Sequence, residues 1–320
     1  MDEPVTNPNV ASGTAADPAV DVIIPTRNRG ELTRDAIESV RAQTYANWRL
    51  VIVDDASDDG SDAQLAAFVA GDDRMTLVRR AAPGGSNAAR QAGLGASTAP
   101  LIASLDSDDL WRPAKLERQV RLLGDVETTG TGLVVCWHEY TRIEDGRRRP
   151  VQRPSLDGRV NPLPSYNMST PLVTRVALEA AGGFASAGAE GLQTTEHVDL
   201  LVRLTAQTGV AVVPELLVDC RHHGGARNSD AQGTAQAAAE AAALLAALEP
   251  GLDDRPRIRA WLRAWVGARH LAIGDKRAGI AFLRSACAGT DTRTTARILR
   301  AYGPFTVKQV VRSMFGRGAR

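Results

Sequence analysis

Apolar and polar residues alternate in blocks along the first hundred positions. Short apolar runs predict buried β-strands at 20–26, 48–55, 75–80 and 99–106. Between them, apolar residues recur at helical spacing and predict helices over 30–45, 63–71 and 86–97. Gly71 is expected to end the second helix, and Ser86 to cap the start of the third. This alternation implies right-handed crossovers and a mainly parallel α/β sheet flanked by helices.

The second half of the chain is more mixed. We expect a strand over 132–143, a long loop over 147–165, a strand running into a helix over 169–184, an amphipathic helix over 195–209 and a strand pair over 210–223. From about residue 233 the sequence is rich in Ala, Leu and Arg and predicts helices, with one pair hinged at Gly274 and Asp275. The expected division is a disordered leader (1–19), an α/β domain (20–230) and a C-terminal helical region (231–320).

Composition narrows the class of protein. The 320 residues carry a net charge of +1, which predicts no nucleic-acid partner. Three cysteines without CxxC spacing argue against a disulfide framework or a zinc ribbon and favour the reducing cytoplasm. The leader has neither the basic start nor the long apolar run of a signal peptide. No window reaches the roughly 18 apolar residues of a spanning helix, so any membrane contact is expected to be peripheral.

Polar clusters follow three of the predicted strands at the point where each strand ends. "PTRNR" starts at Pro25, "DDASDDGSD" starts at Asp54, and "DSDD" starts at Asp106. In open α/β sheets, ligands bind at the carboxyl ends of the strands. The three clusters therefore predict a single binding site at one edge of the sheet.

Asp106 and Asp108 are the candidate metal ligands. Side chains two residues apart on a strand point the same way, so these carboxylates can share one hard cation. Mg²⁺ takes only one or two protein carboxylates and completes its shell with water and phosphate oxygens. The alternative is a solvated loop whose aspartates cap the next helix, because the motif is short and common. A neutral imidazole of His223 could complete a metal site, unless His222 and His223 are simply adjacent surface residues.

Other charged side chains near the strand ends suit a nucleotide. Arg27, at the mouth of the first strand, and Arg90, in the helix before the fourth, carry guanidinium groups that pair well with phosphate. Solvated arginines are the alternative in a chain with 38 basic residues. Asp54 and Asp55 could accept a hydrogen bond from a nucleobase, and ordinary turn chemistry is the competing explanation.

Seven motifs resemble, in order, those of family 2 inverting glycosyltransferases (GT2) with the GT-A fold, a Rossmann-like sheet flanked by helices. They are "VIIPTRNR", "LVIVDDASDDGS", "GGSNAARQAGLGAS", "SLDSDDLWRP", "AAGGF", "EHVDLLVRL" and "CRHHGG", which together cover about residues 20–229. Each motif is short, but the ordered set is specific. The resemblance implies transfer of a sugar from a nucleotide-diphosphate sugar, most often a UDP-sugar, to a saccharide, lipid-linked or other hydroxyl acceptor. It also implies Mg²⁺ or Mn²⁺ as cofactor.

The same resemblance implies a role for each matching position. On the nucleotide side, it implies that Pro25, Thr26 and Arg27 contact the nucleoside, that Asp55, with Asp54 beside it, contacts the base, and that Arg90 contacts the base or the diphosphate. On the metal side, it implies that Asp106 contacts the ribose or the metal, that Asp108 ligates the metal, and that His223 contacts the metal or the diphosphate. The turn from Gly182 to Phe184 would border the donor sugar and the acceptor.

The start of the helix at 195–209 departs from the family pattern. The family usually has Glu-Asp where this chain has Glu196 and His197, and that Asp is taken as the catalytic base. His197 could be the base, since an unperturbed imidazole has a pKa of about 6.5. Glu196 could take the role, and we favour it because a carboxylate tolerates a nearby metal charge. Asp199 lies on the same helix face as Glu196 and is a third candidate, although acids are ordinary in a first helical turn.

Two other functions stay open at this stage. A nucleotidyltransferase would also join a parallel sheet to Mg²⁺ and a nucleotide, but "PTRNRGEL" is a poor version of its Gly-rich basic loop. A non-catalytic nucleotide-sugar or glycan-binding module is motivated by His197. The basic segment 291–320 could lie on an anionic membrane, pack on the catalytic domain or take part in a homodimer.

Overall fold

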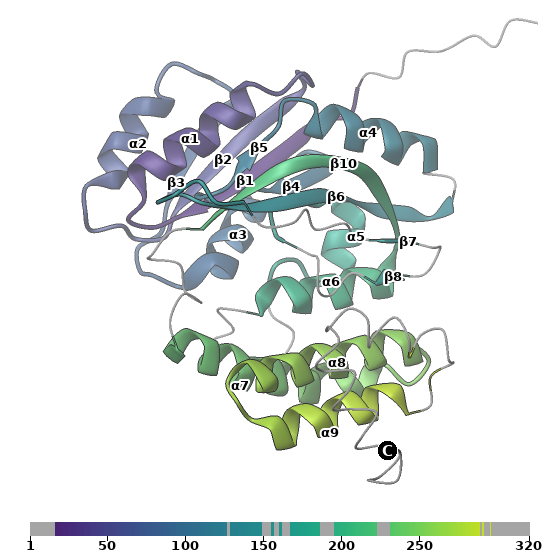
Figure 1. The fold of residues 1–320 in the computed structure, drawn as a ribbon. Helices are drawn as coiled ribbons and strands as arrows, with labels where there is room; N and C mark the ends of the chain where they lie inside the picture. Colours follow the sequence, from purple (N-terminus) through teal and green to yellow (C-terminus); the bar gives the residue numbers. More distant parts are fainter. Residues whose placement is uncertain are drawn as a thin grey trace, which may run out of the picture.

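A computed structural model describes residues 17–126, 129–148, 155–156, 160–161, 167–185, 195–222 and 231–288, together with residues 290 and 295. These residues form an eight-stranded mixed sheet covered by helices on both faces, with a further group of helices beyond one face (Figure 1). Three predictions concern residues outside the described part of the chain: the leader up to residue 16, the role of His223, and the basic segment 291–320, of which only residue 295 is described.

The first half of the chain folds as the apolar pattern predicts. Its strands are β1 (Val20–Thr26), β2 (Trp48–Asp54), β3 (Met75–Arg79) and β4 (Leu101–Ser104), and its helices are α1 (Gly30–Arg41), α2 (Ser61–Val69) and α3 (Gly85–Ala96). β1 pairs in parallel with both β2 and β4, and β2 pairs in parallel with β3. Because β1 is buried along its whole length, its continuous apolar run is typical of a central parallel strand.

The second half turns the sheet from parallel to mixed. Its elements are β5 (Leu110–Trp111), α4 (Lys115–Val126), β6 (Thr131–Arg142), β7 (Ser155–Leu156), β8 (Val160–Asn161), β9 (Leu172–Thr174), α5 (Arg175–Ala180), α6 (Glu196–Gln207) and β10 (Gly209–His222). The strand order is β3-β2-β1-β4-β9-β6-β10-β5. β9 is antiparallel to both β4 and β6, whereas β10 runs parallel to β6 and antiparallel to β5. The predicted α/β class is confirmed; the sheet is parallel from β3 to β4, and its antiparallel pairs all involve β9 or β5.

The C-terminal region is helical, as predicted. It contains α7 (Ala231–Leu248), the short 3₁₀ helix η3 (Glu249–Gly251), α8 (Pro256–Ala272) and α9 (Lys276–Cys287). The turn between α8 and α9 contains Gly274, with φ +83°, and Asp275, whose carboxylate accepts from the Ala278 amide and caps α9. No described helix is both long and apolar enough to cross a membrane.

Several local predictions are wrong or shifted. The expected strand pair at 210–223 is one long strand, β10, because Pro214 interrupts the ladder with β6 between Val213 and Leu216 without ending the strand. Ser86 does not cap α3: the helix begins at Gly85, and the Asp55 carboxylate accepts from the Gly85 amide instead. The long loop at 147–165 contains the small β7–β8 ladder. α1 ends at Arg41, and α2 spans Ser61–Val69. The sequence pattern did not predict α4.

Two apolar cores lie on opposite faces of the sheet. One packs the sheet against α1, α2 and α4. The other starts at the sheet, includes Val198 and Leu204 of α6, and continues to Trp261 and Trp265 of α8. In Figure 1, α6 accordingly lies between the sheet and the C-terminal helices. Because this second core is continuous across residue 230, the division of the chain there stays a prediction.

Candidate active site

The loops that follow β1 and β2 are joined to each other at the edge of the sheet. Asn28 donates from its backbone to Ser57 Oγ (2.9 Å) and from its side-chain amide to Asp58 (2.8 Å), and the Asp58 amide donates back to Asn28 Oδ1 (3.0 Å). Asn28 and Ala56 have φ of 53° and 58°, a left-handed conformation that non-glycine residues adopt at a cost. Backbone strain of this kind collects at functional sites.

Asp55 anchors the start of α3. Its carboxylate accepts from the amides of Gly84 (3.0 Å) and Gly85 (2.7 Å) and pairs with the Arg80 guanidinium. Gly85 has φ +85°, which lets the chain turn its amide toward the carboxylate. Asp54 is also buried and accepts from the side chain and amide of Ser57. Both aspartates therefore shape the end of β2, where the resemblance implied a contact with the nucleobase.

The loop after β4 is held by its third aspartate. Asp109 is 3% exposed, accepts from Ser169 Oγ (2.6 Å) and accepts from the Arg221 amide (3.0 Å). Burial raises the pKa of Asp109 well above its usual range, and the negative charges of Asp108 and Asp106 raise it further. Ser169 also accepts from the Asp106 amide (3.0 Å). The loop is therefore fixed by residues that precede β9 and lie in β10.

Arg90 links this loop to the start of α6. Its guanidinium is 1% exposed and donates to Ser104 Oγ (3.1 Å), to Glu196 Oε1 (3.0 Å) and to Asp106. Ser86 Oγ donates to the same Glu196 oxygen (2.6 Å). The result is a charged network of Asp106, Arg90 and Glu196 below the strand ends. Burial lowers the pKa of Arg90, but the two carboxylates outweigh it, so the pKa is raised and Arg90 stays charged.

Asp106 and Asp108 are the carboxylates available to a cation. Asp108 pairs with Arg29 (2.8 Å), and the side chains of Asp106 and Asp108 are 28% and 17% exposed. Two partly exposed carboxylates fit Mg²⁺ or Mn²⁺, which can complete its shell with water and diphosphate oxygens. The described residues hold no group of three or more His, Cys, Asp or Glu side chains that would bind a metal by themselves. The donor set thus fits a cation shared with a ligand.

The three candidate bases on α6 lie in different surroundings. Glu196 is 8% exposed, and both of its hydrogen bonds fall on Oε1. His197 is partly buried; burial, and next the positive charge of Arg269, lower its pKa to about 4. Asp199 is fully buried and pairs with Arg203 (2.8 Å), which in turn donates to the Gly183 carbonyl (2.9 Å). Asp199 therefore holds α6 to the turn before it.

The remaining predicted residues surround these groups. Pro25 and Thr26 are buried at the end of β1, and the Thr26 hydroxyl is bonded to that of Thr33 (2.7 Å). Arg27 is exposed. The turn from Gly182 to Phe184 is tied to α3, since the Phe184 amide donates to Gln91 Oε1 (2.8 Å).

Sequence reasoning missed several residues that position the site. Ser169 carries no local signal, because it lies in no charged cluster at a predicted strand end. Arg80 ends the predicted strand 75–80 beside Arg79, but this pair was not included among the polar clusters. Arg221 belongs to the motif "CRHHGG", but only the fold shows that its guanidinium pairs with Asp35 of α1 (2.7 Å) while its backbone holds Asp109. Ser86 was expected to act within its own helix and instead contacts Glu196.

Part of the chain is similar in sequence to curated glycosyltransferases. The chain is 35% identical over 106 residues to the putative teichuronic acid biosynthesis glycosyltransferase TuaG of Bacillus subtilis (strain 168). It is 36% identical over 107 residues to WfgD of Escherichia coli, named as a UDP-Glc:alpha-D-GlcNAc-diphosphoundecaprenol beta-1,3-glucosyltransferase. Each match covers 33% of this chain and 42% of the relative, so the chain aligns with less than half of either protein.

Solved structures show the same fold at low sequence identity. Residues 1–349 of S. aureus TarS in complex with UDP superpose with a TM-score of 0.59 at 13% identity, covering 94% of this chain and 93% of that one. The mannosyltransferase PcManGT of Pyrobaculum calidifontis, in complex with GDP-Man and Mn²⁺, gives 0.57 at 19% identity and covers 95% and 89%. The model of the family described as glycosyl transferase family 2 matches residues 21–185, about half of the chain. The chain therefore belongs to glycosyl transferase family 2 and has the GT-A fold.

Proposed function

We propose that this protein transfers a sugar from a nucleotide-diphosphate donor to an acceptor hydroxyl, with inversion at the anomeric carbon. Membership of family 2 supports the reaction type. The observation that carries the proposal for this chain is the buried network of Asp106, Arg90 and Glu196. It joins Asp106, which follows a sheet strand on the proposed donor side, to Glu196, which starts α6 on the proposed acceptor side.

A UDP-sugar is the proposed donor. TarS has been solved with UDP and with UDP-GlcNAc, and the printed name of the E. coli relative specifies UDP-Glc. GDP is the main alternative, because the mannosyltransferase neighbour holds GDP-Man. The proposed acceptor is a hydroxyl of a saccharide or a lipid-linked glycan, the class to which the printed names of both curated relatives point.

Roles on the donor side follow from position. Pro25, Thr26 and Arg27 line the nucleoside pocket, with Asp54 and Asp55 holding its shape. Asp106 and Asp108 hold the divalent cation, which would offset the negative charge on the departing diphosphate. The cation would take over the Asp108 carboxylate from Arg29, which pairs with it here.

Glu196 is the proposed base that takes the proton from the acceptor hydroxyl. Arg90 and Ser86 both donate to Oε1 and fix the orientation of the carboxylate. Among the described residues, Oε2 has no hydrogen-bond partner, so it can accept the proton. A base held by an orienting partner is the arrangement that general-base catalysis needs. His197 is the alternative base, but burial lowers its pKa to about 4, which removes the advantage in basicity that an imidazole ordinarily has over a carboxylate.

Calorimetry with the full-length protein tests the proposal. UDP, dTDP and GDP are each titrated in the presence of Mn²⁺ and in the presence of EDTA. We expect UDP to bind with Mn²⁺ and to lose most of its affinity in EDTA. Release of UDP from a panel of UDP-sugars, measured with and without simple glycoside acceptors, then tests turnover.

Other outcomes would redirect the assignment. Folded protein that binds none of the three diphosphates would contradict the proposed donor site. Metal-dependent UDP binding without turnover on any donor would favour a nucleotide-sugar-binding module. Release of pyrophosphate from nucleoside triphosphates would favour a nucleotidyltransferase.

A further inference from the structure

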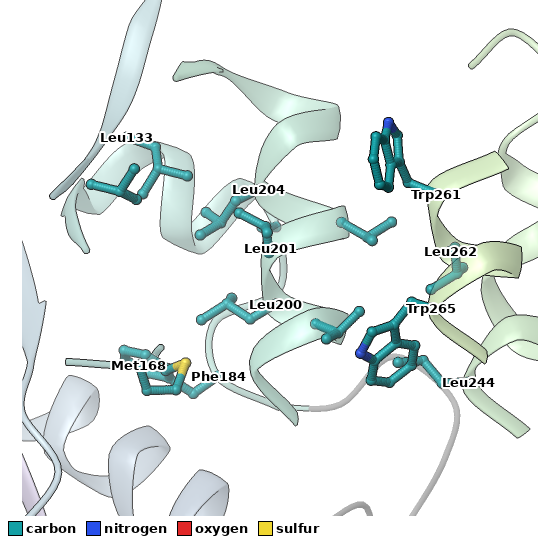
Figure 2. Close-up of a cluster of buried hydrophobic side chains, with 14 of the residues drawn as sticks. Leu133, Met168, Phe184, Leu200, Leu201, Leu204, Leu244, Trp261, Leu262 and Trp265 are labelled. Carbon is teal, nitrogen blue, oxygen red and sulfur yellow. The ribbon is translucent and has the colours of Figure 1, made fainter. Parts of the chain in front are cut away.

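The helix that carries the proposed base is packed between two parts of the molecule. On one side, α6 contacts the sheet core through residues such as Leu200 and Leu204 (Figure 2). On the other side it faces α7 and α8 (Figure 1). Its first residue is Glu196, so any shift of α6 moves the proposed base. The contacts that hold α6 therefore bear directly on the geometry of the site.

Arg255 holds the C-terminal end of α6 from a different part of the chain. Its guanidinium donates from Nη1 to the Thr205 carbonyl (3.2 Å) and from Nη2 to the Ala206 carbonyl (3.0 Å). The last four carbonyls of a helix have no partner within the helix, and they carry the negative end of its dipole. A guanidinium stays positively charged and only donates hydrogen bonds, so it is well suited to bind these carbonyl oxygens. Arg255 thus caps α6 from the residue just before α8.

The N-terminal end of α6 is tied to α7. Thr195, which precedes the helix, is fully buried, and its hydroxyl donates to Glu240 Oε2 (3.5 Å). Thr195 occupies the N-cap position, yet its side chain makes no capping bond within α6. Glu240 is oriented by Gln236, which donates to its other oxygen (2.9 Å). The residue next to the proposed base is therefore attached to the C-terminal helices.

Apolar packing joins the same two parts along their length. In Figure 2, Leu200, Leu201 and Leu204 lie on the side of α6 that faces Leu133 and Phe184, and the labelled α8 side chains lie on the other side of the helix. Trp261 and Trp265 of α8 belong to the same buried cluster and are 4% and 5% exposed. Buried tryptophans are large apolar side chains, so these two add substantially to the apolar core on this side. The positive charge of Arg269, also on α8, lies close enough to His197 to lower its pKa.

We propose that the C-terminal helices are a brace that positions α6, and that Arg255 is a positioning residue for the proposed base. Without this guanidinium, the last turn of α6 loses its cap and the helix shifts, so Glu196 no longer meets the acceptor hydroxyl in the productive geometry. Donor binding stays intact, because the proposed donor contacts come from the ends of β1, β2 and β4. The catalytic part of this inference rests on the proposed function, whereas the bracing of α6 does not.

The test compares Arg255→Ala with a matched control, Arg259→Ala. Arg259 lies one turn further along α8 and pairs with Asp253, which is 85% exposed, so its removal leaves α6 untouched. We expect Arg255→Ala to speed hydrogen exchange in the last turn of α6 about tenfold. We also expect it to lower kcat about 10- to 100-fold, since misplacement by about 1 Å has effects of this size. The Kd for UDP with Mn²⁺ and the donor KM should stay within about twofold of wild type.

Other variants keep the inference open to disproof. Arg255→Lys should recover part of kcat, because an ammonium can still reach one carbonyl. Thr195→Val removes the bond to Glu240 at almost constant volume and should lower kcat in the same direction, even if Arg255→Ala does not fold. Wild-type exchange and wild-type kcat in Arg255→Ala would overturn the proposal, as would an equal loss in Arg259→Ala. A wild type without any transfer would count against the proposed function, and the exchange measurement would still decide whether the brace exists.

Discussion

The loop at 105–109 and the start of α6 supply carboxylates to the same buried arginine, but they are held in place differently. The loop is fixed from within the sheet domain: Leu105 donates from its backbone to Ile23, and Asp109 is bound by Ser169 and Arg221. The start of α6 is held by Arg90 and Ser86 on one side and by Glu240 of α7 on the other. The end of the site that would hold the metal is part of the sheet, whereas the end that would hold the base depends on surrounding helices.

This difference predicts how each end tolerates change. A side chain on the loop follows a strand with a continuous ladder to its neighbours, so removing one functional group alters chemistry more than position. A side chain at the start of α6 depends on several separate contacts. Variants near α6 should therefore mix chemical and positional effects, and paired measurements of kcat and donor binding can separate the two.

The largest expected effect is at the metal end. Asp108→Asn keeps the size of the side chain and removes its charge, so we expect transfer to fall about 10³-fold, because charge stabilisation by a metal supplies several kcal/mol. Metal-dependent binding of UDP should fall with it, as measured by calorimetry. Asp125→Asn, an exposed change on α4, is the control and should leave both unchanged. Near-normal turnover in Asp108→Asn would remove the proposed metal role.

The next largest effect is at the start of α6. Glu196→Gln keeps the bonds that Oε1 accepts and abolishes basicity, so we expect kcat to fall about 10²-fold or more with little change in UDP binding. His197→Ala should cost less than about tenfold, because burial lowers the His197 pKa to about 4 and leaves the imidazole no more basic than a carboxylate, while Glu196 remains to accept the proton. The reverse order of the two variants would transfer the role of base to His197.

A buried cation beneath the loop should make stability depend on pH. Lys115 is fully buried, lies 3.9 Å from the centre of the Trp111 ring, and donates to Gln119 (2.7 Å). Burial lowers its pKa from 10.5 to about 8, which corresponds to a cost of about 3 kcal/mol at about 1.4 kcal/mol per pKa unit.

The sign of this dependence follows from proton binding. Between pH 8 and 10.5 the unfolded chain holds more protons than the folded one, so stability should rise with pH through this window, and below pH 8 the full cost remains. Lys115→Met should therefore stabilise the protein most at neutral pH, and its advantage should shrink by pH 9.5. Urea unfolding at pH 7 and 9.5 measures this. A difference that is constant between pH 7 and 9.5 would mean that folding does not lower the pKa of Lys115.

The smallest effect tests the anchoring of the loop. Ser169→Ala removes a bond to the buried Asp109 carboxylate and one from the Asp106 amide, so we expect a loss of about 2 kcal/mol in the free energy of unfolding. Ser285→Ala on α9 removes only a bond to the Phe282 carbonyl within the helix and should cost less than about 1 kcal/mol. Equal values for the two serines would mean that Ser169 has no special role in the loop.

Local pattern accounts for most of the first half of the fold. Strands β1 to β4 are short apolar runs, and polar clusters follow β1, β2 and β4. The apolar pattern indicates that these are buried strands, and their parallel order places Asp55, Asp106 and Asp108 at the same edge of the sheet. The family resemblance came from the same motifs, and the family match over residues 21–185 confirms it. The roles of single residues within the site stay predictions.

Long-range contacts account for the rest. No sequence pattern links Ser86 or Arg90 to Glu196, more than a hundred positions away, because a hydrogen bond between distant elements leaves no periodic signal. The same holds for Arg255 at the end of α6, which looks like any solvated arginine until the helix carbonyls are placed beside it. Amino-acid pattern therefore predicted most elements of the first half and the residues that we propose carry the chemistry. Packing of distant elements determined which carboxylates are paired, which are buried and what holds α6, since these properties depend on distances in space and not along the chain.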